Sequence, residues 1–134
     1  MPLVIKELHA APRTGALNEE WLLLENTGPN EINTAGVTIA LIQRGARRPR
    51  SLGTLSPGFV IRTGERVRLI TGSSAKKAQG QPPAEEEGLR NYHLFLSEPI
   101  LGKPGEIQLL LKQFELARAT LGPAAAPAPG QPSA

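Results

Sequence analysis

Short apolar-rich runs, each closed by glycine, proline or asparagine, constrain the fold of this 134-residue chain more than any other feature. The separating stretches NTGPN, RGARRP, SPG, RTGE and GKPGE combine residue types that favour chain reversal. Short apolar runs with turn signals between them are typical of β-strands. The predicted strands span 2–8, 20–25, 36–42, 59–61, 66–72, 92–96, 107–112 and 115–121.

The strand prediction is clearest at 66–72, where Val67 and Leu69 alternate with arginines, as expected of a strand with one dry and one wet face. The segment 114–121 also has a helix-favouring composition, so a helix there stays open as an alternative. The chain shows no strand–helix alternation of the kind that builds a parallel sheet. Seven or eight short strands with frequent turns predict an all-β sandwich.

The length of the chain allows one domain, which we assign to 1–121. The stretch 72–91 is polar, charged and rich in glycine and proline, and it predicts a long mobile loop. The stretch 122–134 predicts a disordered Pro/Ala-rich tail. Because no signal peptide or membrane-spanning run is visible, a soluble, cytoplasmic protein without membrane insertion is expected. The absence of cysteine excludes disulfides and thiolate metal sites.

The stretch NEEWLLLENTGPNEINTAGVTIA, residues 18–40, places glutamates beside the only tryptophan. A glutamate-based hydrolase of the retaining glycosidase type needs two carboxyl groups about 5–5.5 Å apart. Glu19 and Glu20 would point to opposite faces of a strand, so we expect them in solvent, and we expect Trp21 to fill the core. The hydrolase is therefore the weakest hypothesis, and an enzyme is not expected. One face would carry Glu20, Leu22 and Leu24, and the other Trp21, Leu23 and Glu25.

The asparagines and histidines of the chain also favour structural roles. Asn26, Asn30 and Asn33 surround a Gly-Pro turn, and asparagine side chains hydrogen-bond the backbone of such corners. His9 and His93 have no partner at metal-ligand spacing. No metal and no cofactor are therefore expected.

Basic residues are concentrated in 44–77, which holds nine basic groups and one acidic group although the chain carries a formal net charge of only +3. Such a patch binds phosphate backbones through counterion release, but aromatic residues for base stacking are scarce. Solvated loop arginines are the simpler interpretation. An acidic protein surface is another, including the glutamates 85–87 of a second copy. The candidate contacts are Arg44, Arg47, Arg48, Arg50, Arg66 and Arg68.

Residues 18–40 resemble the lamin tail domain, the immunoglobulin-like module of nuclear lamins that also occurs in bacterial proteins. In that family an acidic and an aromatic residue open a strand, an Asn-x-Gly corner follows, and a small residue and a glycine enter the next strand. The stretches 55–72 and 102–111 resemble later turns and strands of the family. Val37 replaces the usual aromatic residue, and 112–115 lacks the usual Asp-x-x-Gly hairpin. The matching residues are Glu20, Trp21, Asn26, Gly28, Ala35 and Gly36.

The resemblance covers 3–121 and implies an immunoglobulin-like β-sandwich of about seven to nine strands. Family members serve as non-catalytic interaction or assembly domains, and in lamins they bind proteins and DNA. Our hypothesis is a module that binds a protein partner or itself, through a strand edge or the arginine-bearing face. Sequence-independent nucleic-acid binding by the 44–68 region is the alternative. No small-molecule substrate is expected.

Overall fold

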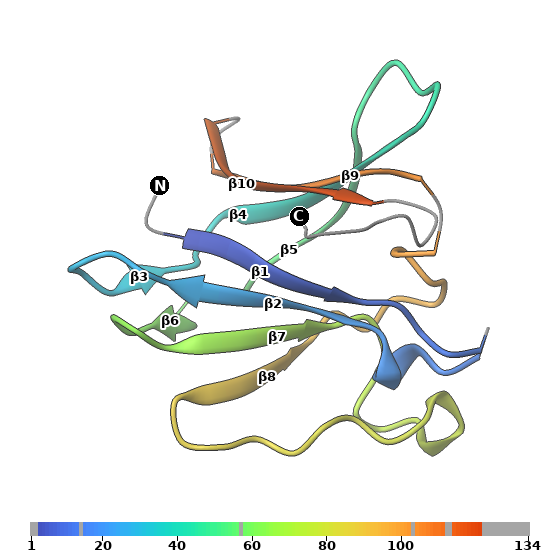
Figure 1. The fold of residues 1–134 in the computed structure, drawn as a ribbon, viewed down its shortest axis with the longest axis horizontal. Coiled ribbons are helices and arrows are strands. Elements are labelled where there is room, and N and C mark those ends of the chain that lie inside the picture. The colour runs from blue at the N-terminus through green and yellow to red at the C-terminus, as the bar shows by residue number, and fades with distance from the viewer. Residues whose placement is uncertain (1–2, 14, 57, 103, 112–113, 122–134) are drawn as a thin grey trace.

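The computed structural model describes residues 3–13, 15–56, 58–102, 104–111 and 114–121 (Figure 1). Within these residues the chain is all-β, with ten strands in packed sheets and two short 3-10 helices. None of the described helices has the length and apolar character needed to cross a membrane. The strands are β1 (Leu3–His9), β2 (Trp21–Asn26), β3 (Ile32–Asn33), β4 (Val37–Gln43), β5 (Arg50–Thr54), β6 (Val60–Ile61), β7 (Arg66–Ile70), β8 (Leu89–His93), β9 (Gly105–Leu111) and β10 (Phe114–Leu121).

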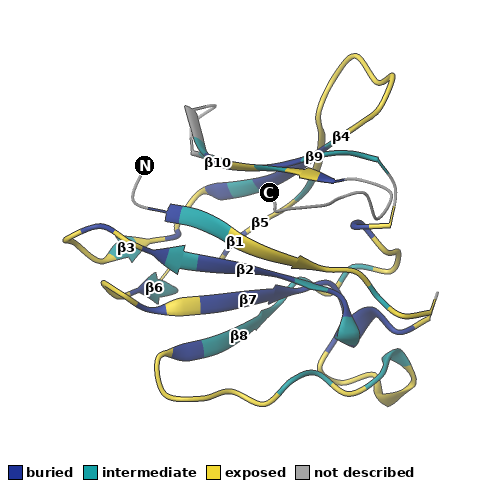
Figure 2. Ribbon diagram, viewed as in Figure 1, coloured by how far each residue is buried: buried dark blue, intermediate teal, exposed yellow. Residues whose placement is uncertain are grey.

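Two four-stranded sheets bury the core between them. One has the order β1-β2-β7-β8 and the other β10-β9-β4-β5, while β3 and β6 pair in a short ladder. Alternate residues of the facing strands fill the core, including Leu22 and Leu24 of β2, Ile39 of β4 and Leu109 of β9. Figure 2 shows these buried strands against an exposed loop between β4 and β5. β1 and β10 are in contact on one side of the sandwich, whereas a cavity lies between β5 and β8 on the other.

The strand predictions are confirmed for most of the chain, including 114–121, which is strand β10 and not the alternative helix. The prediction for 92–96 is placed too late, because β8 ends at His93 and irregular chain follows. β3 and β5 are absent from the prediction. β5 has the sequence RSLGT, which carries no apolar alternation, so its strand conformation depends on pairing with β4.

One pair of strands is parallel, a pairing that the absence of strand–helix alternation argued against. β7 and β8 run parallel, with partners from Arg66–Leu89 to Ile70–His93. A parallel pair needs a crossover of a dozen or more residues, but that crossover does not have to be an α-helix. Here residues 71–88 make the crossover with a single 3-10 turn, η2 (Lys77–Gln79).

The crossover 71–88 corresponds to most of the predicted mobile loop 72–91, and it is anchored at its start and its end. The buried side-chain amide of Asn18, in η1 (Leu17–Glu19), donates to the carbonyls of Ser73 at 2.9 Å and Gly80 at 3.1 Å. Near the end of the crossover, Asn91 Nδ2 donates to the carbonyl of Pro83 at 2.7 Å. Local composition did not reveal these anchors because their partners lie far away in sequence. The predicted tail, 122–134, lies outside the described residues.

Each outer strand carries a feature that opposes the addition of another strand. The ladder shifts by one residue at Lys6 in β1, at Leu52 in β5 and at Leu116 in β10. Such bulges interrupt an edge and increase its twist. On β8, the backbone amide of Asn91 donates to Glu85 Oε2 at 2.8 Å. The edges of this sandwich are therefore poor templates for strand addition.

Candidate interaction site

Glu20 is buried, so the expectation that it lies in solvent is wrong. It is 1% exposed. Its Oε1 accepts hydrogen bonds from the Thr71 hydroxyl at 2.7 Å and the Ile100 amide at 2.8 Å, and Oε2 accepts from the Leu101 amide at 3.3 Å. A buried carboxylate is tolerable only where donors replace its water shell. Glu20 therefore fastens the chain that precedes β9 to the first sheet.

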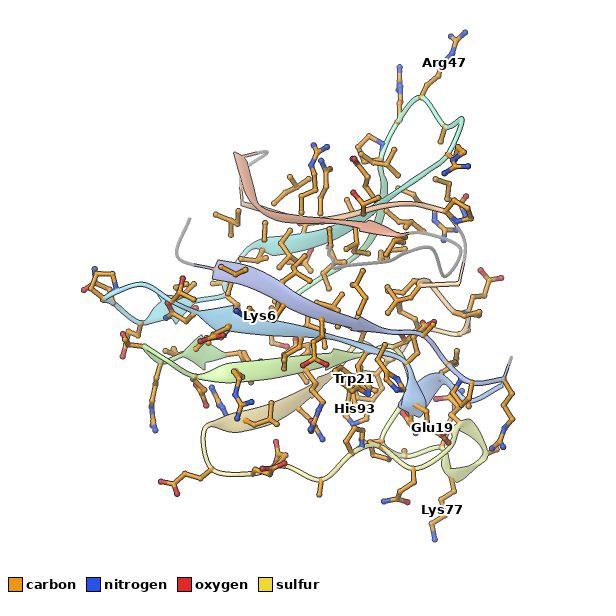
Figure 3. The ribbon with its side chains drawn as sticks, viewed as in Figure 1. Lys6, Glu19, Trp21, Arg47, Lys77 and His93 are labelled. Atoms are coloured by element: carbon orange, nitrogen blue, oxygen red, sulfur yellow. The ribbon has the colours of Figure 1, made fainter. Side chains whose placement is uncertain are left out.

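The other glutamates that flank Trp21 occupy separate surroundings. Glu25 pairs with Lys6, with 3.8 Å between Oε1 and Nζ. The Glu19 carboxylate packs on Gly80 of the crossover, and Figure 3 shows Glu19 in η1, apart from Lys6 on β1. Within the described residues, no three His, Asp, Glu or Cys side chains are grouped so as to hold a metal ion.

Trp21 packs on the outer face of the first sheet, so the prediction that it fills the core is wrong. The ring of His9 lies parallel to the indole with 4.8 Å between centroids, and the guanidinium carbon of Arg68 is 5.2 Å from the indole centroid. The strand alternates as predicted, but Leu22 and Leu24 take the inner face. Trp21 instead forms a stacked cluster with two cationic or aromatic neighbours.

Asn26 forms the predicted corner after β2. Its Oδ1 accepts a hydrogen bond from the Gly28 amide at 3.0 Å, and its Nδ2 donates to the carbonyls of Asn30 at 2.9 Å and Ile61 at 3.0 Å. Asn33 likewise accepts from the Ala35 amide. These side chains replace backbone partners at a sharp turn, and the corner prediction is confirmed.

Four of the six candidate arginines lie together on the hairpin of β4 and β5. Arg44, Arg47 and Arg48 are exposed in the loop, and Arg50 is exposed at the start of β5. The loop projects from the end of the sheet, with Arg47 in solvent at its tip (Figure 3). None of the ion pairs among the described residues involves these four side chains. The arginine hairpin, as we name these four residues, thus concentrates positive charge, with Glu98 in the same hollow as Arg50 and Glu106 in the same hollow as Arg44.

The other two candidate arginines lie on β7, in the opposite sheet. Arg66 is exposed, but Arg68 is only 9% exposed. Arg68 Nη1 donates to the Ala84 carbonyl at 3.1 Å and to Asn91 Oδ1 at 3.2 Å. Arg68 therefore supports the packing of the crossover. The six arginines do not form a single basic face.

A cleft of about 450 Å³ opens between β5 and β8. Leu52 and Leu94 line it from the two sides, and Tyr92 fixes its rim. The Tyr92 hydroxyl accepts from the Ser56 amide at 2.6 Å and donates to Ser56 Oγ at 2.7 Å. Leu52 also lines a second hollow of about 180 Å³ that reaches Arg50. The arginine hairpin therefore adjoins the cleft through Arg50.

Phe95, beside the cleft, was missed as a functional candidate. Its ring is exposed, with 65% of the residue accessible. It is the one non-glycine among the described residues with a positive φ, at 57°. Backbone hydrogen bonds from Leu94, Phe95 and Leu96 to the end of β7 and the start of the crossover hold this conformation. A left-handed bulky residue costs about 1–3 kcal/mol and has no sequence signal, so the strand prediction could not reveal it.

A bidentate ion pair supports the cleft from β8. Arg90 Nε is 2.5 Å from Glu65 Oε2, and its guanidinium carbon lies 4.5 Å from the centroid of the Phe59 ring, which meets Tyr92 edge-on. Burial acts to raise the pKa of Glu65. Hydrogen bonds from Arg90 and from the Arg62 amide, together with both positive charges, outweigh burial and place that pKa below its ordinary value.

Comparison with known proteins gives no assignment for this chain. No family model matches it, and no curated protein matches it.

Proposed function

We propose that the chain is a non-catalytic interaction module that binds a protein partner through the arginine hairpin and the cleft beside it. The observation that carries this proposal is a cluster of four exposed arginines that take part in none of the ion pairs of the described residues and that adjoin a concave, partly apolar surface through Arg50. Clustered charge accelerates encounter, and a desolvated hollow supplies anchoring contacts. The bulged edges make strand addition the weaker route.

We further propose that the sandwich is immunoglobulin-like and related to the lamin tail domain. The Asn26–Gly28 corner and the two four-stranded sheets support this relationship. Two features of this chain can be compared with lamin tail domains. They are the outward position of Trp21 and the parallel pairing of β7 with β8. An experimentally determined structure whose connectivity differs from that of lamin tail domains would remove this part of the proposal.

Two matched variants test the interaction. Arg47→Ser with Arg48→Ser removes two charges from the hairpin, and Lys76→Ser with Lys77→Ser removes two from the exposed crossover. We expect a partner captured by the immobilised wild-type chain to bind the hairpin variant about tenfold more weakly and the crossover variant almost unchanged. Biolayer interferometry with the purified partner measures both affinities. Equal binding by all three proteins contradicts the proposal.

The same four arginines support nucleic-acid binding as the second candidate function. Four phosphate contacts predict that log affinity falls with log salt at a slope of about 3.6, whereas six contacts would give about 5.4. Fluorescence anisotropy with a labelled DNA duplex across a salt series measures the slope. No binding at low salt removes this candidate.

A further inference from the structure

We infer that the cleft recognises an extended acidic peptide segment of the partner, with one bulky apolar side chain inserted beside Phe95 and carboxylates held by the arginine hairpin. This inference rests on the proposed function and specifies the chemistry of the partner. It is carried by the shape of the cleft, by the exposed and strained phenylalanine, and by the charge at one end.

The apolar part of the ligand is indicated by the larger hollow. Its volume of about 450 Å³ lies within the range of sites that enclose small molecules or side chains. Leu52, Tyr92, Leu94 and Phe95 line it. The Phe95 ring is free to pack against an incoming group because most of it faces solvent. Aromatic rings next to a hollow are effective anchors for another apolar side chain.

The acidic part of the ligand is indicated by charge. The smaller hollow extends from Leu52 to Arg50 and includes Glu98. Glu106 lines another hollow with Arg44 and is already paired with Arg118. The arginine hairpin supplies four positive charges against these two carboxylates. Thr54 lines the larger hollow and Arg50 the smaller, four residues apart along β5. A ligand strand with the rise of about 3.3 Å per residue would place its carboxylates about four residues from the apolar anchor.

The conformation of Phe95 points to a role in binding. Three consecutive amides, from Leu94 to Leu96, donate to carbonyls of Ile70, Gly72 and Thr71 and hold the ring outward. Strain of this kind persists where the surrounding structure enforces it, and it is common at ligand sites. A residue that tolerates positive φ would relieve the strain while it removed the ring. Replacing Phe95 by such a residue should therefore raise the stability of the chain and lower its affinity for the ligand.

A displayed library of random peptides, selected against the full chain, tests the inference. We expect enriched peptides to share a bulky apolar residue about four positions from a run of Asp or Glu. Phe95→Asn removes the ring and suits the left-handed backbone, so it should melt at or above the wild-type temperature yet bind the selected peptides at least about tenfold more weakly. Phe95→Tyr keeps the ring and should retain binding. Arg47→Ser with Arg48→Ser should weaken binding to a similar extent.

The contrary outcomes separate this inference from the proposed function. Absence of enriched peptides, enrichment of peptides without acidic residues, or full binding by Phe95→Asn would each overturn the inference. A folded partner that depends on the hairpin but is insensitive to Phe95→Asn would also overturn it, while the proposed function would stand. The selected peptide can also be challenged with nucleic acid, with a small apolar compound or with a second copy of the chain. If just one of these competitors displaced the peptide, the surface would be assigned to that occupant instead.

Discussion

Glu20 shows how one side chain can join distant parts of this fold. Its oxygens accept from the amides of Ile100 and Leu101 and from a threonine hydroxyl. In Glu20→Gln, either orientation of the amide turns an NH2 group toward a backbone donor. We expect the free energy of unfolding in urea to fall by about 2–3 kcal/mol. Glu25→Gln, which loses only the exposed pair with Lys6, should change it by less than about 1 kcal/mol. Equal losses of stability in the two variants would contradict the role of Glu20 in fastening the chain that precedes β9.

Glu65 provides a pH-dependent test at the same scale. Its pKa in the folded chain lies below the ordinary value of 4.5, so its ionised form contributes stability that is complete above that pH. As pH falls, the unfolded chain binds the proton first, and stability is lost until the folded carboxyl is protonated too. We expect the difference in unfolding free energy between wild type and Glu65→Gln to narrow below about pH 4.5. If the difference in unfolding free energy stayed constant in acid, the lowered pKa of Glu65 would be contradicted.

At the scale of elements, the crossover 71–88 depends on a side chain from outside it. Asn18→Ala removes the donor to Ser73 and Gly80 without touching the core between the sheets. We expect local opening of the crossover to become about 5–30-fold more frequent, since one or two buried hydrogen bonds are lost. Trypsin should then cut faster after Lys77, while cleavage after Arg47 in the arginine hairpin serves as the internal control. A proportional increase at both positions would indicate global destabilisation instead.

Sequence patterns were informative about elements and much less so about their surroundings. The apolar runs located β1, β2, β4, β7, β9 and β10 because local alternation is sufficient for a strand that packs on a core. The face of β2 that turns inward was assigned wrongly, since His9 of β1 and Arg68 of β7 give Trp21 a stacked position on the outer face. β5 and the left-handed Phe95 depend on tertiary contacts alone. The arginine hairpin was visible in the sequence, but the cleft beside it was not.

At the scale of the whole molecule, the two long sides of the sandwich differ. On one side β1 and β10 are in contact, and both carry bulges. On the other side the strands are separated by the cleft, with β5 bulged at Leu52 and β8 covered by Glu85. A protein that prevents edge pairing while leaving a charged cleft open is suited to recognition by side chains.

This asymmetry predicts that the chain alone is a monomer. Edge pairing is opposed on all four outer strands, and contact between the arginine hairpin and the glutamates 85–87 of another copy would consist of exposed ion pairs of little energy. Sedimentation equilibrium at low and high salt should give the monomer mass in both. Association that disappears at high salt and in Arg47→Ser with Arg48→Ser would indicate pairing through the acidic loop. Association that persists in salt and in Phe95→Asn would show that the bulged edges do pair, and it would contradict the monomer.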